Sequence, residues 1–449
     1  CLDEPAMPVN LKRFLLPLAL PLVIASCGVS DWFGETEEPP LPGQRIAILA
    51  YERGLRADPT IADTVVRLPE PYVNTDWSQP GGSAAHAMYH LSLSANPRRV
   101  WSADLGEGSG DVAQLLAEPI VVGDTVYTMD SRSLVSAFSA SSGSRLWQVD
   151  LEDEDEDAGF FGGGVSADNG QVYVATGFAR VFALDASTGE TIWIHKAPGP
   201  VRGAPVVSDK RVFVVTLDNQ LLVLNTETGE RLWNHVGVQE TAGLLGSASP
   251  AVARNTVIVP YSSGEVLALL TEDGRQVWSE NLSATRRLDP LADIAQVRGL
   301  PVIDRDLVIA VSHAGRMLAV DLRQGVRAWQ ADIGGVNMPW AAGDFIYLVT
   351  NDGQVVCLQR ADGRIRWVTP LPRFADPDEQ EELIRWRGPV LAGDRLILAG
   401  SHGEVISVSP YDGKPLGVIS LGDGAAVAPV VANNSLYLVT NGGELVAMR

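Results

Sequence analysis

Short apolar runs separated by polar turn residues recur along the chain from residue 134 to the C-terminus. One unit contains runs at 204–207, 211–216 and 220–224, followed by a turn that leads to Trp233. Short apolar runs bounded by turn residues are typical of β-strands. Stripes with the helical period of about 3.6 residues do not occur. The pattern therefore predicts an all-β protein.

A turn glycine followed four residues later by tryptophan marks each unit. Seven copies begin at Gly143, Gly189, Gly229, Gly274, Gly325, Gly363 and Gly413, and the last copy has Gly417 in place of the tryptophan. Units of about 40 to 50 residues with four strands each are typical of β-propeller blades. We expect the glycine to adopt a positive φ angle and the tryptophan to pack between neighbouring blades.

The ends of the repeat region complement each other. An eighth unit begins at Gly443 and stops at Arg449, while the missing strand is found at residues 98–101. Pairing of these N- and C-terminal strands would leave no open sheet edge. Residues 98–449 are therefore predicted to form an eight-bladed β-propeller with four-stranded antiparallel blades and a ring closed by its two ends.

The segment before the repeats has the features expected of an export signal. Lys12 and Arg13 precede an apolar run at residues 14–25, which is shorter than the roughly 20 residues of a membrane-spanning helix. This favours a signal peptide that starts at Met7 and ends at Ser26. Residues 1–26 thus comprise a few upstream residues and the signal peptide. Residues 24–27, Ile-Ala-Ser-Cys, match a lipobox, which predicts acylation of Cys27. The alternative is an ordinary signal peptide with a chance cysteine.

Residues 27–97 are interpreted as a lipidated tether followed by a segment that lies along the propeller surface. The formal charge of −21 argues against nucleic-acid binding and against charge-driven attachment to anionic lipid. Besides Cys1 and Cys27, the only cysteine is Cys357, within a strand-like run. We expect a buried structural thiol there rather than a nucleophile.

The remaining polar motifs do not assemble a catalytic or metal site. Counted from its second residue, the acidic run 152–157 has Ala158 at position six and Gly164 at position twelve, where an EF-hand requires glycine and glutamate. His86 and His90 have the spacing of one helical turn but lack the glutamate of a zinc-protease helix. No catalytic residue, metal, cofactor or small-molecule substrate is predicted.

The tryptophan repeat, the count of eight blades and the lipobox together resemble the BamB family of the β-barrel assembly machinery, over about residues 95–449. The resemblance implies a non-catalytic scaffold lipoprotein on the periplasmic face of the outer membrane. Its implied partners are the POTRA domains of a BamA-like protein and other assembly subunits. The same class of propeller includes quinoprotein dehydrogenases, so a periplasmic quinoprotein is the alternative.

The resemblance also implies partner-binding residues on two loops. The family's leucine pattern falls on Leu244 and Leu245, where Leu245 replaces a basic residue. A paired-aspartate pattern falls on Asp293 and Ala295, so that one acid is missing. Three neighbouring charged residues are candidates to compensate: Arg286, Arg287 and Asp289.

Overall fold

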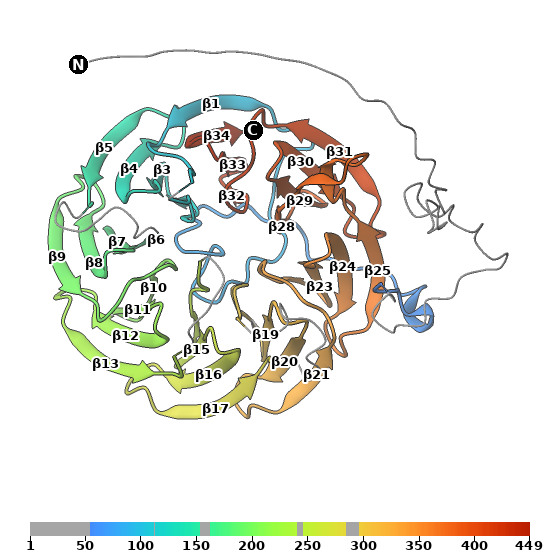
Figure 1. The fold of residues 1–449 in the computed structure, drawn as a ribbon, viewed down its shortest axis with the longest axis horizontal. Coiled ribbons are helices and arrows are strands. Elements are labelled where there is room, and N and C mark those ends of the chain that lie inside the picture. Colours follow the sequence, from blue (N-terminus) through green and yellow to red (C-terminus); the bar gives the residue numbers. More distant parts are fainter. Residues whose placement is uncertain (1–53, 112, 153–161, 240–245, 284–295) are drawn as a thin grey trace, which may run out of the picture. The chain divides into compact units, whose positions relative to one another are not determined.

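The structure is a computed structural model that describes residues 54–111, 113–152, 162–239, 246–283 and 296–449. Residues Leu55–Arg449 form one compact unit. Within it, eight four-stranded antiparallel sheets are arranged radially about an axis (Figure 1). The predicted all-β, eight-bladed propeller is confirmed. The only helical turn among the described residues is the 3-10 turn η3 (Pro59–Ile61), and none of their helices is long and apolar enough to cross a membrane.

The blades follow one another in chain order, and each begins at its inner strand. The first two blades are β2 (Ile120–Val122), β3 (Thr125–Met129), β4 (Leu134–Ser139), β5 (Arg145–Asp150) and β6 (Gly163–Asp168), β7 (Gln171–Thr176), β8 (Arg180–Asp185), β9 (Thr191–Lys196). The next two are β10 (Val206–Ser208), β11 (Arg211–Val215), β12 (Gln220–Asn225), β13 (Arg231–Val236) and β14 (Ala251–Ala253), β15 (Thr256–Pro260), β16 (Glu265–Leu270), β17 (Gln276–Asn281).

The second half of the ring repeats this order. Its first two blades are β18 (Val302–Asp304), β19 (Leu307–Val311), β20 (Met317–Asp321), β21 (Arg327–Ala331) and β22 (Trp340–Ala342), β23 (Phe345–Val349), β24 (Gln354–Gln359), β25 (Ile365–Pro370). A hairpin of β26 (Phe374–Asp376) and β27 (Glu381–Leu383) precedes the blade β28 (Trp386–Ala392), β29 (Arg395–Gly400), β30 (Glu404–Val408), β31 (Pro415–Ser420).

The last blade joins the two ends of the repeat region. It contains β32 (Val430–Ala432), β33 (Ser435–Val439), β34 (Glu444–Met448) and, outermost, β1 (Arg99–Asp104). Strand β1 pairs antiparallel with β34, and Trp101 lies opposite Ala447. The backbone amides of Arg98 and Arg449 each donate to the other residue's carbonyl, at 2.7 and 2.9 Å. The predicted closure of the ring is therefore confirmed.

The glycine and tryptophan of the repeat meet across the boundary between blades. The seven turn glycines have φ angles of 70° to 77°, and a Cβ atom on any of them would lie within 2.8 Å of the preceding blade's tryptophan. Each indole N–H donates to a backbone carbonyl of the next blade, as Trp278 does to Leu322 at 2.9 Å. Both expectations for the motif are confirmed. The pairs are Trp101–Gly143, Trp147–Gly189, Trp193–Gly229, Trp233–Gly274, Trp278–Gly325, Trp329–Gly363 and Trp367–Gly413.

The eighth boundary lacks this contact for a topological reason. Gly417 of β31 stands where the tryptophan would be, and the neighbouring blade is the one closed by β34 and β1. Because these two strands come from opposite ends of the repeat region, no turn joins them and no turn glycine is present to receive an indole ring. The Arg99 guanidinium instead donates to the Leu421 carbonyl across this boundary, at 3.1 Å.

An extended segment, residues 72–93, passes the inner strands of all eight blades; we call it the inner segment. Trp77 exchanges two backbone hydrogen bonds with Val121 of β2, at 2.7 and 2.8 Å. The other inner strands or their ends are contacted through Ser78–Ala167, Gln79–Val207, Ala84–Val252, Ala85–Ile303, Tyr89–Trp340, Leu91–Leu391 and Asn74–Val431. The inner segment thus belongs to the compact unit.

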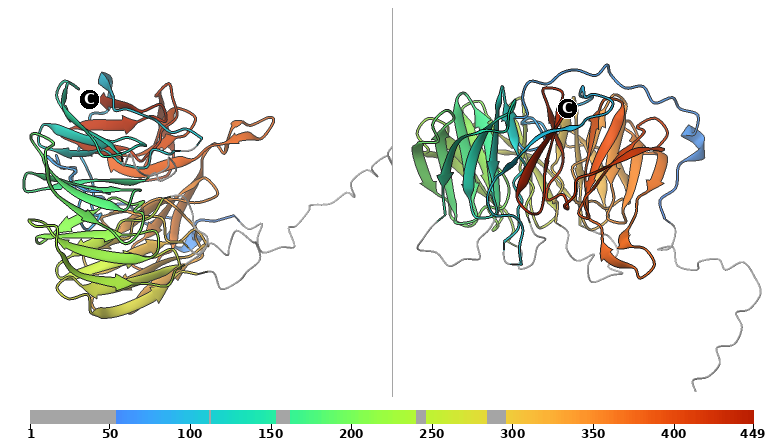
Figure 2. Two further views of the ribbon diagram at one scale, coloured as in Figure 1. Left: turned by 60° about the vertical axis from the view of Figure 1, so that its left-hand side comes forward. Right: turned by 90° about the horizontal axis from the view of Figure 1, so that it is seen from above.

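Burial distinguishes the inner segment from a surface strand. Trp77 is 1% exposed and Leu91 is fully buried, and the Trp77 ring stacks on Trp340 with centroids 6.2 Å apart. The segment lies on the opposite side of the ring from the β26–β27 hairpin (Figure 2). The sequence suggested a segment along the surface that ends at residue 97, whereas the compact unit extends back to Leu55. The eight sets of inner-strand contacts explain the difference.

Candidate partner-binding face and central channel

One face of the ring, which we call the loop face, carries the connections that lead from the outer strand of a blade to the inner strand of the next. Two of them, 237–250 between β13 and β14 and 282–301 between β17 and β18, contain the predicted partner-binding residues. Those residues, namely Leu244, Leu245, Arg286, Arg287, Asp289 and Asp293, lie outside the described residues, as does Cys27.

The described ends of these two connections contact each other. The side-chain amide of Gln296 donates to the backbone carbonyl of Gly246 at 2.9 Å, and Gln296 is buried. A Cβ atom on Gly246 would lie 3.3 Å from Nε of Arg298, so the two chain segments pack closely where each returns to its blade. The structure therefore brings together the C-terminal ends of the two predicted loops.

The β26–β27 hairpin projects from the same face (Figure 2). Its residues from 375 to 383 are exposed and include five acidic side chains, and Leu383 is 58% exposed. No motif in the sequence indicated a role for this hairpin. In the sequence the hairpin corresponds to an acidic insertion around Pro377. This insertion lies between the repeat tryptophan Trp367 and Trp386, the first residue of the next inner strand.

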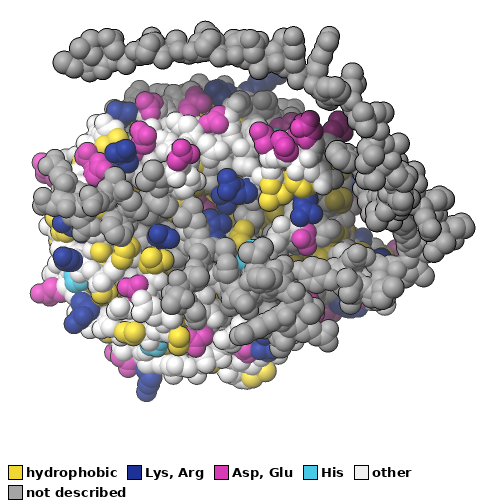
Figure 3. Space-filling model, in the orientation of Figure 1, with side chains coloured by type: hydrophobic (Ala, Val, Ile, Leu, Met, Phe, Trp, Pro, Cys, Tyr) yellow, Lys and Arg dark blue, Asp and Glu magenta, His cyan; other side chains and the backbone are white. Residues whose placement is uncertain are grey.

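The central channel opens on this face, where Lys and Arg side chains gather near the centre (Figure 3). An inner chamber of about 140 Å³ is lined by Trp77, Pro80 and Gly81 of the inner segment. An outer chamber of about 340 Å³ lies at the mouth of the channel, where it opens on the loop face, and its lining includes Arg385 and Trp386. The inner segment therefore bounds the inner chamber on the side away from the mouth.

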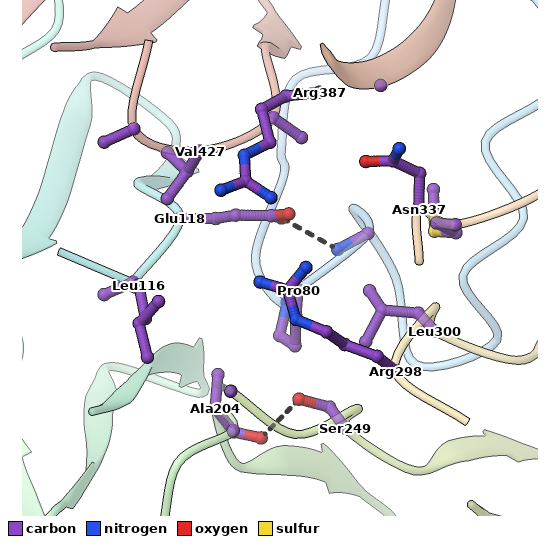
Figure 4. Close-up of a pocket in the computed structure, with 18 of the residues that line it drawn as sticks. Pro80, Leu116, Glu118, Ala204, Ser249, Arg298, Leu300, Asn337, Arg387 and Val427 are labelled. Atoms are coloured by element: carbon purple, nitrogen blue, oxygen red, sulfur yellow. Dashed lines mark hydrogen bonds between the residues drawn. The ribbon is translucent and has the colours of Figure 1, made fainter. Parts of the chain in front are cut away.

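Charged side chains meet inside the channel (Figure 4). The Glu118 carboxylate accepts a hydrogen bond from the Gly81 amide at 3.3 Å. Burial raises the pKa of Glu118, although the Gly81 bond and the positive charge of Arg387 oppose the rise. Burial, together with repulsion from Arg298 and Arg385, lowers the pKa of Arg387 to about 9. Burial also lowers the pKa of Arg298.

The other candidates from the sequence occupy structural positions. Nδ1 of His86 lies 2.7 Å from the Pro301 carbonyl, and burial lowers the pKa of His86 to about 4. Nδ1 of His90 lies 2.8 Å from the Pro69 carbonyl. Cys357 is fully buried in β24, which raises the pKa of its thiol and fits the expected structural role. Of the acidic run, 153–157 lies outside the described residues.

The described residues do not fit the quinone and calcium of a quinoprotein. The resemblance implies a vicinal cysteine pair for such a site, and this sequence has no adjacent cysteines. Among the residues that the structure describes, no three His, Cys, Asp or Glu side chains gather to hold a metal ion. The carboxylate of the inner chamber, Glu118, faces arginines, and the repeat tryptophans are engaged between blades.

Comparison with known proteins gives consistent matches. A family model described as "Outer membrane protein assembly factor BamB" matches residues 131–369. The Salmonella typhimurium protein of that name is 32% identical over 359 residues, which cover 78% of this chain and 88% of that protein.

Solved structures share the fold at lower identity. The crystal structure of BamB from Moraxella catarrhalis has a TM-score of 0.64 and 20% identity, and the match covers 79% of this chain and 98% of that chain. Quinohemoprotein alcohol dehydrogenase from Comamonas testosteroni has a TM-score of 0.65 and 15% identity, with coverage of 83% and 80%. At these identities the two structures show the propeller fold alone.

Proposed function

The chain belongs to the BamB family of outer membrane protein assembly factors, and from this premise we propose that it is a non-catalytic scaffold of such an assembly complex. In this proposal it docks on the periplasmic POTRA domains of a BamA-like protein. The docking surface consists of the loops that contain Leu244, Leu245 and Asp293, supported by Arg286, Arg287 and Asp289.

The observation that carries this proposal is the contact between the ends of the two loops. The 2.9 Å hydrogen bond from Gln296 to Gly246 anchors both connections at one place on the face. Because the described ends of the two connections lie together on one face, a partner that docks there contacts both loops at once. The propeller then acts as a rigid support for a binding surface and needs no catalytic group.

Replacing Leu244 and Leu245 together with serine is expected to abolish capture of the BamA-like protein from detergent-solubilised membranes. Burial of each leucine at an interface contributes about 1.5 to 3 kcal/mol, so the double change weakens binding by about a hundredfold or more. The matched control is Leu146→Ser on outer strand β5, because Leu146 is 55% exposed. Undiminished capture by the double variant would place the binding surface elsewhere, and a lower melting temperature would show that the leucines are core residues.

Lipidation of Cys27 is a separate part of the proposal. The change Cys27→Ala is expected to move the protein from the membrane fraction to the soluble fraction, because several acyl chains hold a protein stably at a bilayer. Cys1→Ala, upstream of the apolar run, is the matched control and should leave fractionation unchanged. The measurement is membrane fractionation with mass spectrometry of the N-terminal peptide. Membrane retention of Cys27→Ala, with no acyl mass on the wild type, would contradict lipidation.

A further inference from the structure

The two chambers of the central channel meet at a neck. Six residues line both chambers: Leu116, Arg298, Val336, Asn337, Arg387 and Ala426. Arg298 precedes β18 and Arg387 belongs to β28, so that different blades supply the two guanidinium groups. Both side chains extend into the cavity, with Glu118 between them (Figure 4). The neck therefore holds two guanidinium groups that come from different blades.

The charge of the channel is opposite to that of the whole chain. Five arginines and two carboxylates line the chambers, although the chain has a net charge of −21. Of the two carboxylates, Glu118 lines the inner chamber and Asp352 lines the outer chamber. The arginines are Arg202, Arg298, Arg373, Arg385 and Arg387. The described lining thus has an excess of positive charge.

Arg387 has unused hydrogen-bonding capacity at the neck. Its Nε atom is buried and has no hydrogen-bond partner among the described residues. A buried donor without a partner is costly, and the cost is greater when the donor carries charge. The side-chain amide nitrogen of Asn337, also at the neck, donates to the Trp386 carbonyl at 3.1 Å. Because this nitrogen is a donor, it does not accept a hydrogen bond from Nε of Arg387. An anionic acceptor would satisfy both the donor and the charge.

We propose that the neck of the central channel binds a small oxyanion of the phosphate or carboxylate class through Arg298 and Arg387. The planar guanidinium group presents paired N–H donors that match the oxygens of such an anion. The anion enters from the loop face, because the inner segment bounds the inner chamber on the other side. A chamber of about 140 Å³ has room for a small anion with accompanying water. Glu118 competes with the anion for the same positive charge.

The test is isothermal titration calorimetry of the mature, full-length protein with two probes, inorganic phosphate and citrate. Saturable binding of phosphate alone identifies the phosphate class, and binding of citrate alone identifies the carboxylate class. The variant Arg387→Gln is expected to bind about tenfold more weakly, the effect of losing one charged hydrogen bond. Arg364→Gln is the matched control, because Arg364 is an exposed arginine paired with Asp362 at 2.8 Å and should leave the affinity unchanged.

A second variant keeps the test decisive if Arg387→Gln does not fold. Glu118→Gln removes the competing carboxylate at nearly constant volume and is expected to tighten binding several-fold. The absence of saturable binding of both probes to the wild type would overturn the proposal. Binding that Arg387→Gln leaves unchanged, or that Glu118→Gln fails to strengthen, would also overturn it. The outcome does not depend on whether the loops dock on a partner.

Discussion

Removal of residues 443–449 is expected to abolish cooperative folding of the propeller. Strand β34 lies between β1 and β33, so its loss removes the backbone hydrogen bonds that β1 and β33 make to it, and β33 keeps those to β32. Leu445, Val446 and Ala447 are fully buried. Truncating one large buried aliphatic side chain costs about 2 to 5 kcal/mol, so loss of the whole strand is comparable with the total stability of a typical domain, about 5 to 15 kcal/mol.

A point variant tests the same closure in a protein that still folds. Leu445→Ala is expected to lower the free energy of unfolding by about 2 to 5 kcal/mol. Its control is the adjacent Glu444→Ala, which removes only a 3.6 Å surface ion pair with Arg99 and should cost less than about 1 kcal/mol. The measurement is urea unfolding followed by tryptophan fluorescence. A truncated protein as stable as the full chain would contradict closure by β34.

Trp77→Ala is expected to cost about 3 to 5 kcal/mol of unfolding free energy, the range for deleting a buried aromatic side chain. Trp77 is 1% exposed, stacks on Trp340 and lines the inner chamber of the channel. The large effect follows because the inner segment is part of the core of the propeller. The midpoint of chemical unfolding measures it.

Val73→Ala is the matched control in the same segment. Val73 is 51% exposed, and a change at an exposed position away from special contacts usually alters stability by less than about 0.5 kcal/mol. If Trp77→Ala and Val73→Ala have equal, small effects, the inner segment does not contribute to stability as the structure indicates.

The propeller was predictable from the sequence because its determinants are local and repeated. The spacing of Gly229 and Trp233 recurs in six of the seven copies, and the same contact forms wherever a turn glycine follows in the next blade. The absence of a tryptophan at Gly417 is explained by the same topology, since the turn that would receive the ring is where the two ends of the repeat region meet. Closure followed from counting partial units.

The inner segment was not predictable in the same way because its contacts are unique and distant in sequence. The side chain of Asn74 donates to Val431 at 2.7 Å, and Gln79 pairs with Val207. The polar residues among the glycines and serines of 72–93 resemble an exposed loop, and no periodicity indicates which strands they contact. Only the assembled ring creates the row of inner-strand partners that buries them.

The channel was missed for a related reason. Glu118, Arg298 and Arg387 lie in separate repeats, and none belongs to a motif that specifies its direction. They meet because the ring places connections and inner strands around one axis. The partner-binding residues, in contrast, came from the family resemblance, and they remain predictions because they lie outside the described residues.

Docking through the loop face can be tested by site-specific photo-crosslinking in intact membranes. A photoreactive amino acid is placed at position 245, within the proposed docking loop, or at position 73, which is exposed on the inner segment at the other side of the ring. We expect a crosslink to the BamA-like protein from position 245 and none from position 73. A crosslink from position 73 together with none from position 245 would contradict it.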